Sequence, residues 1–147
     1  MNYQEYEEKC ERLKEKNYEY INLFQSELIQ QGLSTKTINK HTANVDFYLN
    51  EFLLWSEPKT MSEGCVEISE YLGYFFIRKC MWSTPASIRN NASSLKKFYK
   101  CMLSYGEIEK EQYEEMCETI RYGLDDWIAD CKQYNDISQP NPFDIFG

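Results

Sequence analysis

Apolar side chains recur every three or four residues along most of this chain, and this spacing limits its fold more than any other feature. After Pro85, for example, the positions i, +4, +7, +11 and +14 hold Ile88, Ala92, Leu95, Tyr99 and Met102. These positions form one face of an α-helix. No segment shows the alternation typical of a β-strand, and the chain has only 6 glycines and 4 prolines to interrupt helices. The pattern predicts an all-α fold.

The spacing and the turn residues predict five helices, over about residues 3–31, 34–55, 67–81, 85–105 and 109–134. Ser34 is a good N-cap, Pro85 suits a first helical position, and Gly32 and Gly106 suit the ends of helices. Asn17 could mark a kink in the first helix or a late start of it. A chain of 147 residues has the length of one domain. We therefore expect a single bundle of four to five helices over residues 1–136, followed by an extended tail over residues 137–147.

Composition excludes several classes of protein. Hydrophobic residues make up 42% of the chain and aromatic residues 16%, which is too apolar for a disordered chain. No run of 18 apolar residues is present, and the first sixteen residues are charged throughout, unlike a signal peptide. We expect a cytoplasmic protein that does not interact with a membrane.

No motif for catalysis or cofactor binding is evident. The six cysteines include no Cys-x-x-Cys pair, so we expect reduced, mostly buried thiols and no zinc. The single histidine, His41, is expected at the surface. Nucleotide-binding glycine motifs are missing, and the carboxylate pair Glu114 and Glu118 is typical of a solvated helix face. The sequence predicts a protein that is not an enzyme and has no cofactor.

Charge is unevenly distributed along the chain, whose net charge is −8. Residues 34–106 hold 9 basic and 6 acidic side chains, whereas residues 107–147 hold 3 basic and 11 acidic ones. A mildly basic middle therefore precedes a strongly acidic C-terminal third.

Two predicted helices carry the basic residues of the middle segment. The fourth helix has a stripe of Arg89, Ser93, Lys96 and Lys100, with Lys97 beside it, and no acid from residue 83 to residue 105. A face of one sign suits a polyanion, although an ordinary lysine-rich face would look the same. The second helix begins with hydroxyl and basic side chains that could bind phosphate, although capping alone also explains the hydroxyls: Ser34, Lys36, Thr37 and Lys40.

Three segments resemble a known family in their order and spacing. They are residues 32–38 (GLSTKTI), residues 83–88 (STPASI) and residues 95–99 (LKKFY). Together they are similar to the SAM-like, N-terminal core-binding domain of tyrosine recombinases, the phage integrases, over about residues 18–108. Members of this family clamp duplex DNA with the second and fourth helices of a four-helix module.

The resemblance implies a role in DNA binding during recombination or integration. Its motif positions imply DNA contacts from Ser34, Lys36, Thr37, Lys40, Arg89, Lys96 and Lys100, to which we add the neighbouring Lys97. A full recombinase also has a catalytic domain, but the 39 residues after residue 108 contain no histidine and a single arginine. Strand cleavage is therefore not implied, and the expected partner is double-stranded DNA, bound weakly and in a salt-sensitive way.

The acidic helix at 109–134 suggests a different function. Its carboxylates would repel phosphate, so this helix and the tail could instead bind a protein partner or imitate DNA. The tail residues Asn141, Pro142 and Phe143 could pack on the bundle or on a partner.

Overall fold

The computed structural model describes residues 1–138, which form an α-helical bundle without a strand in that range. The helix α1 spans Tyr3–Gln30, α2 spans Thr35–Phe47, α5 spans Pro85–Ser104 and α6 spans Lys110–Ser138. The remaining predicted helix consists of α3 (Ile68–Glu70), a π-helical turn at Tyr71–Phe75 and α4 (Phe76–Lys79). The all-α prediction is confirmed. The extended tail was predicted to begin at residue 137, but residues 137 and 138 continue α6, because the helix runs on to Ser138. The rest of the predicted tail, residues 139–147, lies outside the described residues.

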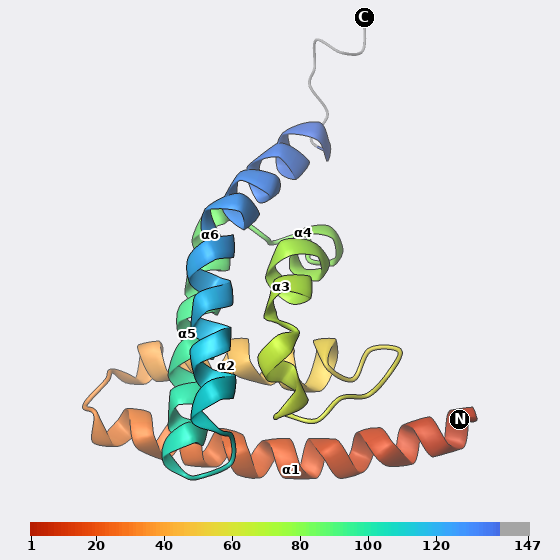
Figure 1. Ribbon diagram of the computed structural model, residues 1–147, viewed down its shortest axis with the longest axis vertical. Helices are drawn as coiled ribbons and strands as arrows, with labels where there is room; N and C mark the ends of the chain where they lie inside the picture. Colours follow the sequence, from red (N-terminus) through yellow and green to blue (C-terminus); the bar gives the residue numbers. More distant parts are fainter. Residues whose placement is uncertain (139–147) are drawn as a thin grey trace, which may run out of the picture.

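The arrangement of the helices is visible in Figure 1. The helices α5 and α6 lie side by side as an antiparallel hairpin, and α1 runs across one end of the hairpin. The helix α2 packs on both α1 and α5. One continuous core joins all of these elements, with the side chains of Phe24, Val45, Leu95, Phe98 and Met116 fully buried in it.

Helix ends follow the predicted capping residues. Ser34 Oγ accepts a hydrogen bond from the N–H of Thr37 at the start of α2. Gly32 and Gly106 follow the last turns of α1 and α5 with φ angles of 78° and 75°, a left-handed conformation that glycine adopts without strain. At both ends the N–H groups bond back to carbonyls of the last turn in the Schellman pattern, for example from Leu33 to Leu28. The chain therefore turns where the sequence predicts.

Two helices differ locally from the continuous α-helices expected from the sequence. The predicted helix at 34–55 ends in a π-helical turn at Tyr48–Phe52, and the helix at 67–81 contains another at Tyr71–Phe75. A π-turn is wider than an α-turn, so residues four positions apart come more nearly into line. Tyr48 stacks on Phe52 with ring centroids 5.5 Å apart, and Tyr71 contacts both rings at 4.8 and 4.9 Å. The two wider turns thus lie where these large rings pack on one another.

Asn17 does not kink α1, contrary to expectation. The side chain is buried, and its Nδ2 donates to Asn50 Oδ1 at 2.8 Å. Asn50 in turn donates to Asp46 at 2.6 Å. A partner on a distant segment of the chain thus satisfies a polar group that the local sequence identifies only as a weak helix former.

Candidate nucleic-acid interface

The predicted basic residues lie on two helices that pack against each other, α2 and α5. All six basic side chains are exposed: Lys36, Lys40, Arg89, Lys96, Lys97 and Lys100. Ion pairs within residues 1–138 join other side chains, so none of the six has a carboxylate within 4.0 Å. Exposed cations without a carboxylate partner are available to an external anion.

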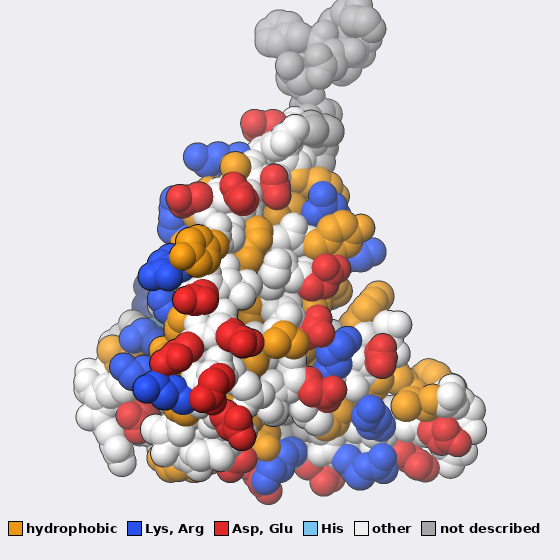
Figure 2. Space-filling view, viewed as in Figure 1, with side chains coloured by type: hydrophobic (Ala, Val, Ile, Leu, Met, Phe, Trp, Pro, Cys, Tyr) orange, Lys and Arg blue, Asp and Glu red, His pale blue; other side chains and the backbone are white. Residues whose placement is uncertain are grey.

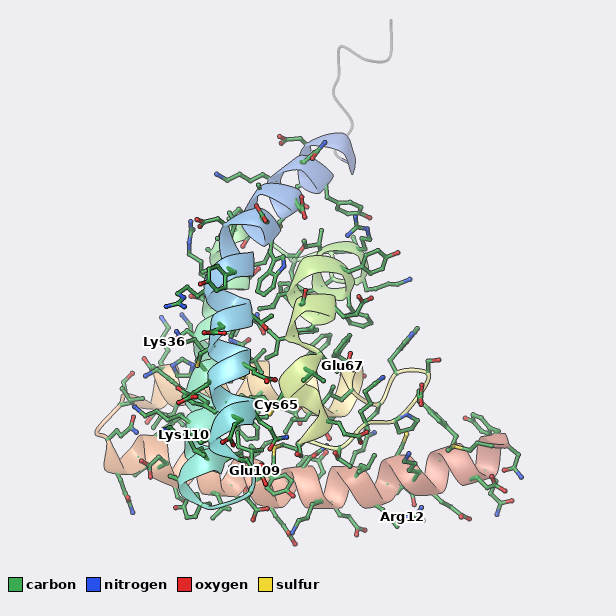
Figure 3. The ribbon with its side chains drawn as sticks, in the orientation of Figure 1. Arg12, Lys36, Cys65, Glu67, Glu109 and Lys110 are labelled. Carbon is green, nitrogen blue, oxygen red and sulfur yellow. The ribbon has the colours of Figure 1, made fainter. Side chains whose placement is uncertain are left out.

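Hydroxyl groups at the two helix starts are already used for capping. Ser34 caps α2, and its Oγ also donates to Thr37 Oγ1 at 3.0 Å. Thr84 and Ser87 form a reciprocal capping box at the start of α5, with bonds of 3.0 and 2.7 Å. Capping therefore accounts for the hydroxyl of Ser34. This is the alternative to phosphate binding that the sequence left open. Lys36 follows in the first turn of α2 and lies at the outer edge of the molecule (Figure 3).

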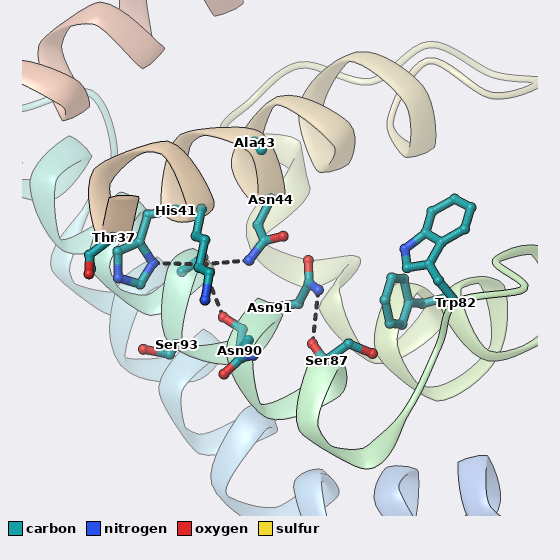
Figure 4. A pocket seen from close by; sticks show the side chains of 12 residues that line it. Thr37, His41, Ala43, Asn44, Trp82, Ser87, Asn90, Asn91 and Ser93 are labelled. Atoms are coloured by element: carbon teal, nitrogen blue, oxygen red, sulfur yellow. Dashed lines mark hydrogen bonds between the residues drawn. The ribbon is translucent and has the colours of Figure 1, made fainter. Parts of the chain in front are cut away.

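A groove of about 420 Å³ lies between α2 and α5 and is shown in Figure 4. Of the predicted residues it contains Thr37 and Lys40, whereas Ser34, Lys36 and Arg89 lie outside it. Seven of its twelve lining residues carry amide or hydroxyl side chains, and no carboxylate of the described residues lines it. The full lining is Thr37, Lys40, His41, Ala43, Asn44, Phe76, Trp82, Ser87, Asn90, Asn91, Ser93 and Ser94.

His41 lies at the surface only in part. It is half-buried in the groove, and its Nδ1 lies 2.7 Å from Ser94 Oγ. Ser94 Oγ also accepts from Asn44 Nδ2 at 3.0 Å and donates to the Asn90 carbonyl at 3.0 Å. Burial and the nearby Lys97 charge lower the pKa of His41. Both effects favour the neutral imidazole, whose Nδ1 shares a hydrogen bond with Ser94 Oγ.

Ser94 and His41 resemble part of a nucleophilic dyad in residue type alone. Ser94 is completely buried, with an exposed fraction of 0%, so its Oγ cannot reach a substrate carbonyl or phosphate. Its proton is also directed at the Asn90 carbonyl. The geometry makes this pair a link between α2 and α5.

Three predicted lysines of α5 face different neighbours. Lys96 lines a hollow together with Glu114 and Glu118 of α6. Lys97 and Lys100 line another hollow, which includes Glu27 of α1. The eight predicted residues therefore do not form one continuous site, and Lys96 lies at the border with the acidic helix.

Acidic side chains gather on the face of α6 turned toward the viewer in Figure 2, while basic side chains lie along the left edge of the same view. Glu114, Glu115, Glu118, Asp125 and Asp126 are all exposed. The opposite side of α6 is buried in the core through Met116, Ile120, Trp127, Ile128 and Cys131. A polyanion that contacts α2 and α5 must therefore approach from the side away from this acidic face.

Several groove residues were missed by sequence reasoning, among them Trp82 and Asn91. Trp82 lies in the loop before α5, outside any helical pattern, with 59% of its surface exposed. Asn91 sits within the apolar face of α5 and is only 5% exposed. A buried asparagine in a helix that otherwise buries apolar residues is the one signal that could have indicated a polar site there.

Cysteine chemistry does not contribute to this surface. Burial raises the pKa of Cys65 to about 12 and that of Cys80 and Cys101 to about 11. Within residues 1–138, no three side chains of the His, Cys, Asp and Glu types come together as metal ligands. No helix in that range is both long and apolar enough to cross a bilayer.

The chain matches no protein-family model, no curated protein and no solved structure.

Proposed function

We propose that this chain is a non-catalytic module that binds double-stranded DNA through α2 and α5, as part of DNA recombination or integration. The observation that carries the proposal is the set of six exposed basic side chains on these two helices, none of them ion-paired with another described residue. A protein of net charge −8 has more carboxylates than basic side chains, so all six could have been paired. Basic side chains that the fold leaves without an ion pair favour an anionic partner.

The resemblance to recombinase core-binding domains supports the same surface. It assigns DNA contacts to the second and fourth helices of the module, which correspond here to α2 and α5. The all-α architecture is the one that this resemblance requires, but it does not by itself identify the family.

Binding is expected to be weak and strongly dependent on salt. Lys96 shares a hollow with two glutamates, whereas Lys97 and Lys100 share theirs with one, Glu27. We therefore assign the phosphate contacts to five side chains: Lys36, Lys40, Arg89, Lys97 and Lys100. Five contacts give a log–log salt slope of roughly −4 to −5. Such contacts position a protein on DNA but specify no sequence.

The test is a fluorescence-anisotropy titration of a labelled duplex with the full chain, from 50 to 200 mM salt. The double substitution Lys36→Glu with Arg89→Glu should lower the slope by roughly 2 and weaken binding at least about tenfold. A glutamate in the first turn of α2 also favours the helix, so the fold should persist. A matched control is Arg12→Glu with Lys132→Glu, which changes the net charge equally on α1 and α6. Equal losses in both double variants, or no duplex binding at 50 mM salt, would contradict the proposal.

Neutralising the two α6 carboxylates that share a hollow with Lys96 gives a second test. Removing α6 would expose the core, so substitution is preferable to truncation. Glu114→Gln with Glu118→Gln should strengthen duplex binding, because their carboxylates lie beside Lys96. The control is Glu8→Gln with Glu11→Gln, which removes the same charge from exposed positions of α1.

A protein partner for the acidic face of α6 is the second candidate. The observation that favours it is that Tyr122, 74% exposed, lies on α6 among the exposed carboxylates. A basic partner would bind this face, and the Glu114→Gln and Glu118→Gln variant would then lose binding in a pull-down.

A further inference from the structure

The groove between α2 and α5 is the wrong shape for an intact duplex. It is concave, about 420 Å³ in volume, and closed at one side by Trp82. Pockets of roughly 300–1,000 Å³ hold small molecules, and this one lies near the lower end of that range. A duplex presents its own grooves to a protruding helix, so it cannot fill a hollow between two helices. Only a chemical group that projects from a larger molecule can enter the groove.

Asn91 gives the groove a defined polar group. The residue is 5% exposed, and its Nδ2 donates to the Ser87 carbonyl at 2.9 Å. Its Oδ1 and second amide hydrogen have no partner among the described residues, and the groove is the surface that this residue lines. Asn44 likewise uses its Nδ2 on Ser94, which leaves its Oδ1 without a described partner. In Figure 4 both asparagines point into the hollow. Amide groups with free donors and acceptors match the hydrogen-bonding edge of a nucleobase.

Trp82 supplies an aromatic surface that lines the same groove as these amides. Phe47 packs against its ring, with centroids 5.8 Å apart and planes at 80°, so the indole is supported on one side. The ring is nevertheless 59% exposed. An exposed ring held in place beside hydrogen-bonding groups is the arrangement by which proteins stack an unpaired base.

The other end of the groove suits a phosphate. Thr37 and Ser93 lie at the end away from Trp82 (Figure 4), and Lys40 also lines the groove. Thr37 and Asn44 are seven residues apart on α2, which corresponds to roughly 10 Å along the helix. With no carboxylate in the wall, a phosphate entering beside Lys40 meets no repulsion from the groove itself.

We propose that this groove binds one unpaired nucleotide, with its base against Trp82 and Asn91 and its phosphate beside Lys40. This inference rests on the proposed DNA-binding function and adds a site for a base that has left the duplex or belongs to a single strand. The shared chemistry is a nucleobase attached to a phosphate, whether from a strand or from a free nucleotide.

The experiment measures tryptophan fluorescence and anisotropy of the full chain with three probes: a single-stranded oligo-dA, a matched duplex and free dAMP. The single strand should quench the fluorescence and bind more tightly than the duplex. Trp82→Leu should remove most of the quenching and weaken single-strand binding about 5- to 150-fold, the effect of losing one stacked base. Trp82→Phe, which keeps a ring, should restore most of the affinity.

Trp55→Leu is the matched control, because Trp55 is similarly exposed at 62% but does not line the groove. It should retain both the quenching and the affinity. Saturable, Trp82-dependent binding of dAMP would support the site with a free nucleotide as ligand, and Trp82-dependent binding of the strand alone would support it with a strand. Duplex binding that is sensitive to Lys36 and Arg89, together with single-strand binding indifferent to Trp82, would overturn this inference while the proposed function stands. Failure of every probe to bind would overturn both.

Discussion

Removing the hydroxyl of Tyr99 should destabilise the protein by about 1 kcal/mol. Tyr99 is completely buried on α5, and its hydroxyl donates to the Met61 carbonyl at 2.7 Å. Burial raises the pKa of Tyr99 well above its usual value, so the group stays a neutral donor. In Tyr99→Phe the Met61 carbonyl keeps a second bond, from the Gly64 N–H at 3.0 Å. The cost is therefore that of a net hydrogen bond, about 1 kcal/mol, and not that of an orphaned carbonyl.

Tyr71→Phe provides the matched control. Tyr71 is equally buried and surrounded by aromatic rings, but its hydroxyl has no hydrogen-bond partner among the described residues. Phenylalanine keeps the ring contacts and removes an unpaired buried polar group, so Tyr71→Phe should be neutral or stabilising.

The measurement is urea unfolding, with thermal unfolding as a second readout. With an unfolding entropy of about 2.1 cal/mol/K per residue, a loss of about 1 kcal/mol lowers the Tm by about 3 °C for a chain of this length. The slope of the urea transition should not change, because both variants expose the same surface. If Tyr71→Phe loses as much stability as Tyr99→Phe, the assignment of one satisfied and one unsatisfied hydroxyl is refuted.

Three further predictions follow from burial and close packing. Gly64→Ala should destabilise the fold by about 1–3 kcal/mol, since a Cβ there would lie 2.5 Å from the Tyr99 hydroxyl and 2.8 Å from Leu53 Cδ1. Urea unfolding measures this, and a stability equal to wild type would contradict the packing. A thiol reagent should react rapidly with the half-buried Cys10 and Cys117 and with the four buried cysteines only after unfolding; six fast thiols in the native state would refute this. The lowered pKa of His41 means that the unfolded chain binds more protons near pH 6, so stability should fall as the pH drops below about 6.5. His41→Gln should flatten the dependence of Tm on pH between 7.5 and 5.5, and an unchanged slope would show that another group titrates there.

Local sequence determined most of the helical architecture. The apolar spacing of α5 predicted a stripe from Ile88 to Met102 that is entirely buried, because a helix with one apolar face has only one way to shield it. The starts and ends of helices followed from residues that act over one turn, namely Ser34, Gly32 and Gly106. The polar and charged surface of α6 was predicted for the same reason.

Tertiary structure alone decided what lies at the groove. Trp82 is placed there by the loop before α5, and Asn44 and Asn91 line one groove only because two helices distant in sequence pack together. The same packing separates Lys96, which lies beside the glutamates of α6, from Lys40, which lines the groove. Helical periodicity reports which face of a helix is buried but not which neighbour covers it, and the chemistry of a site between two helices depends on that neighbour.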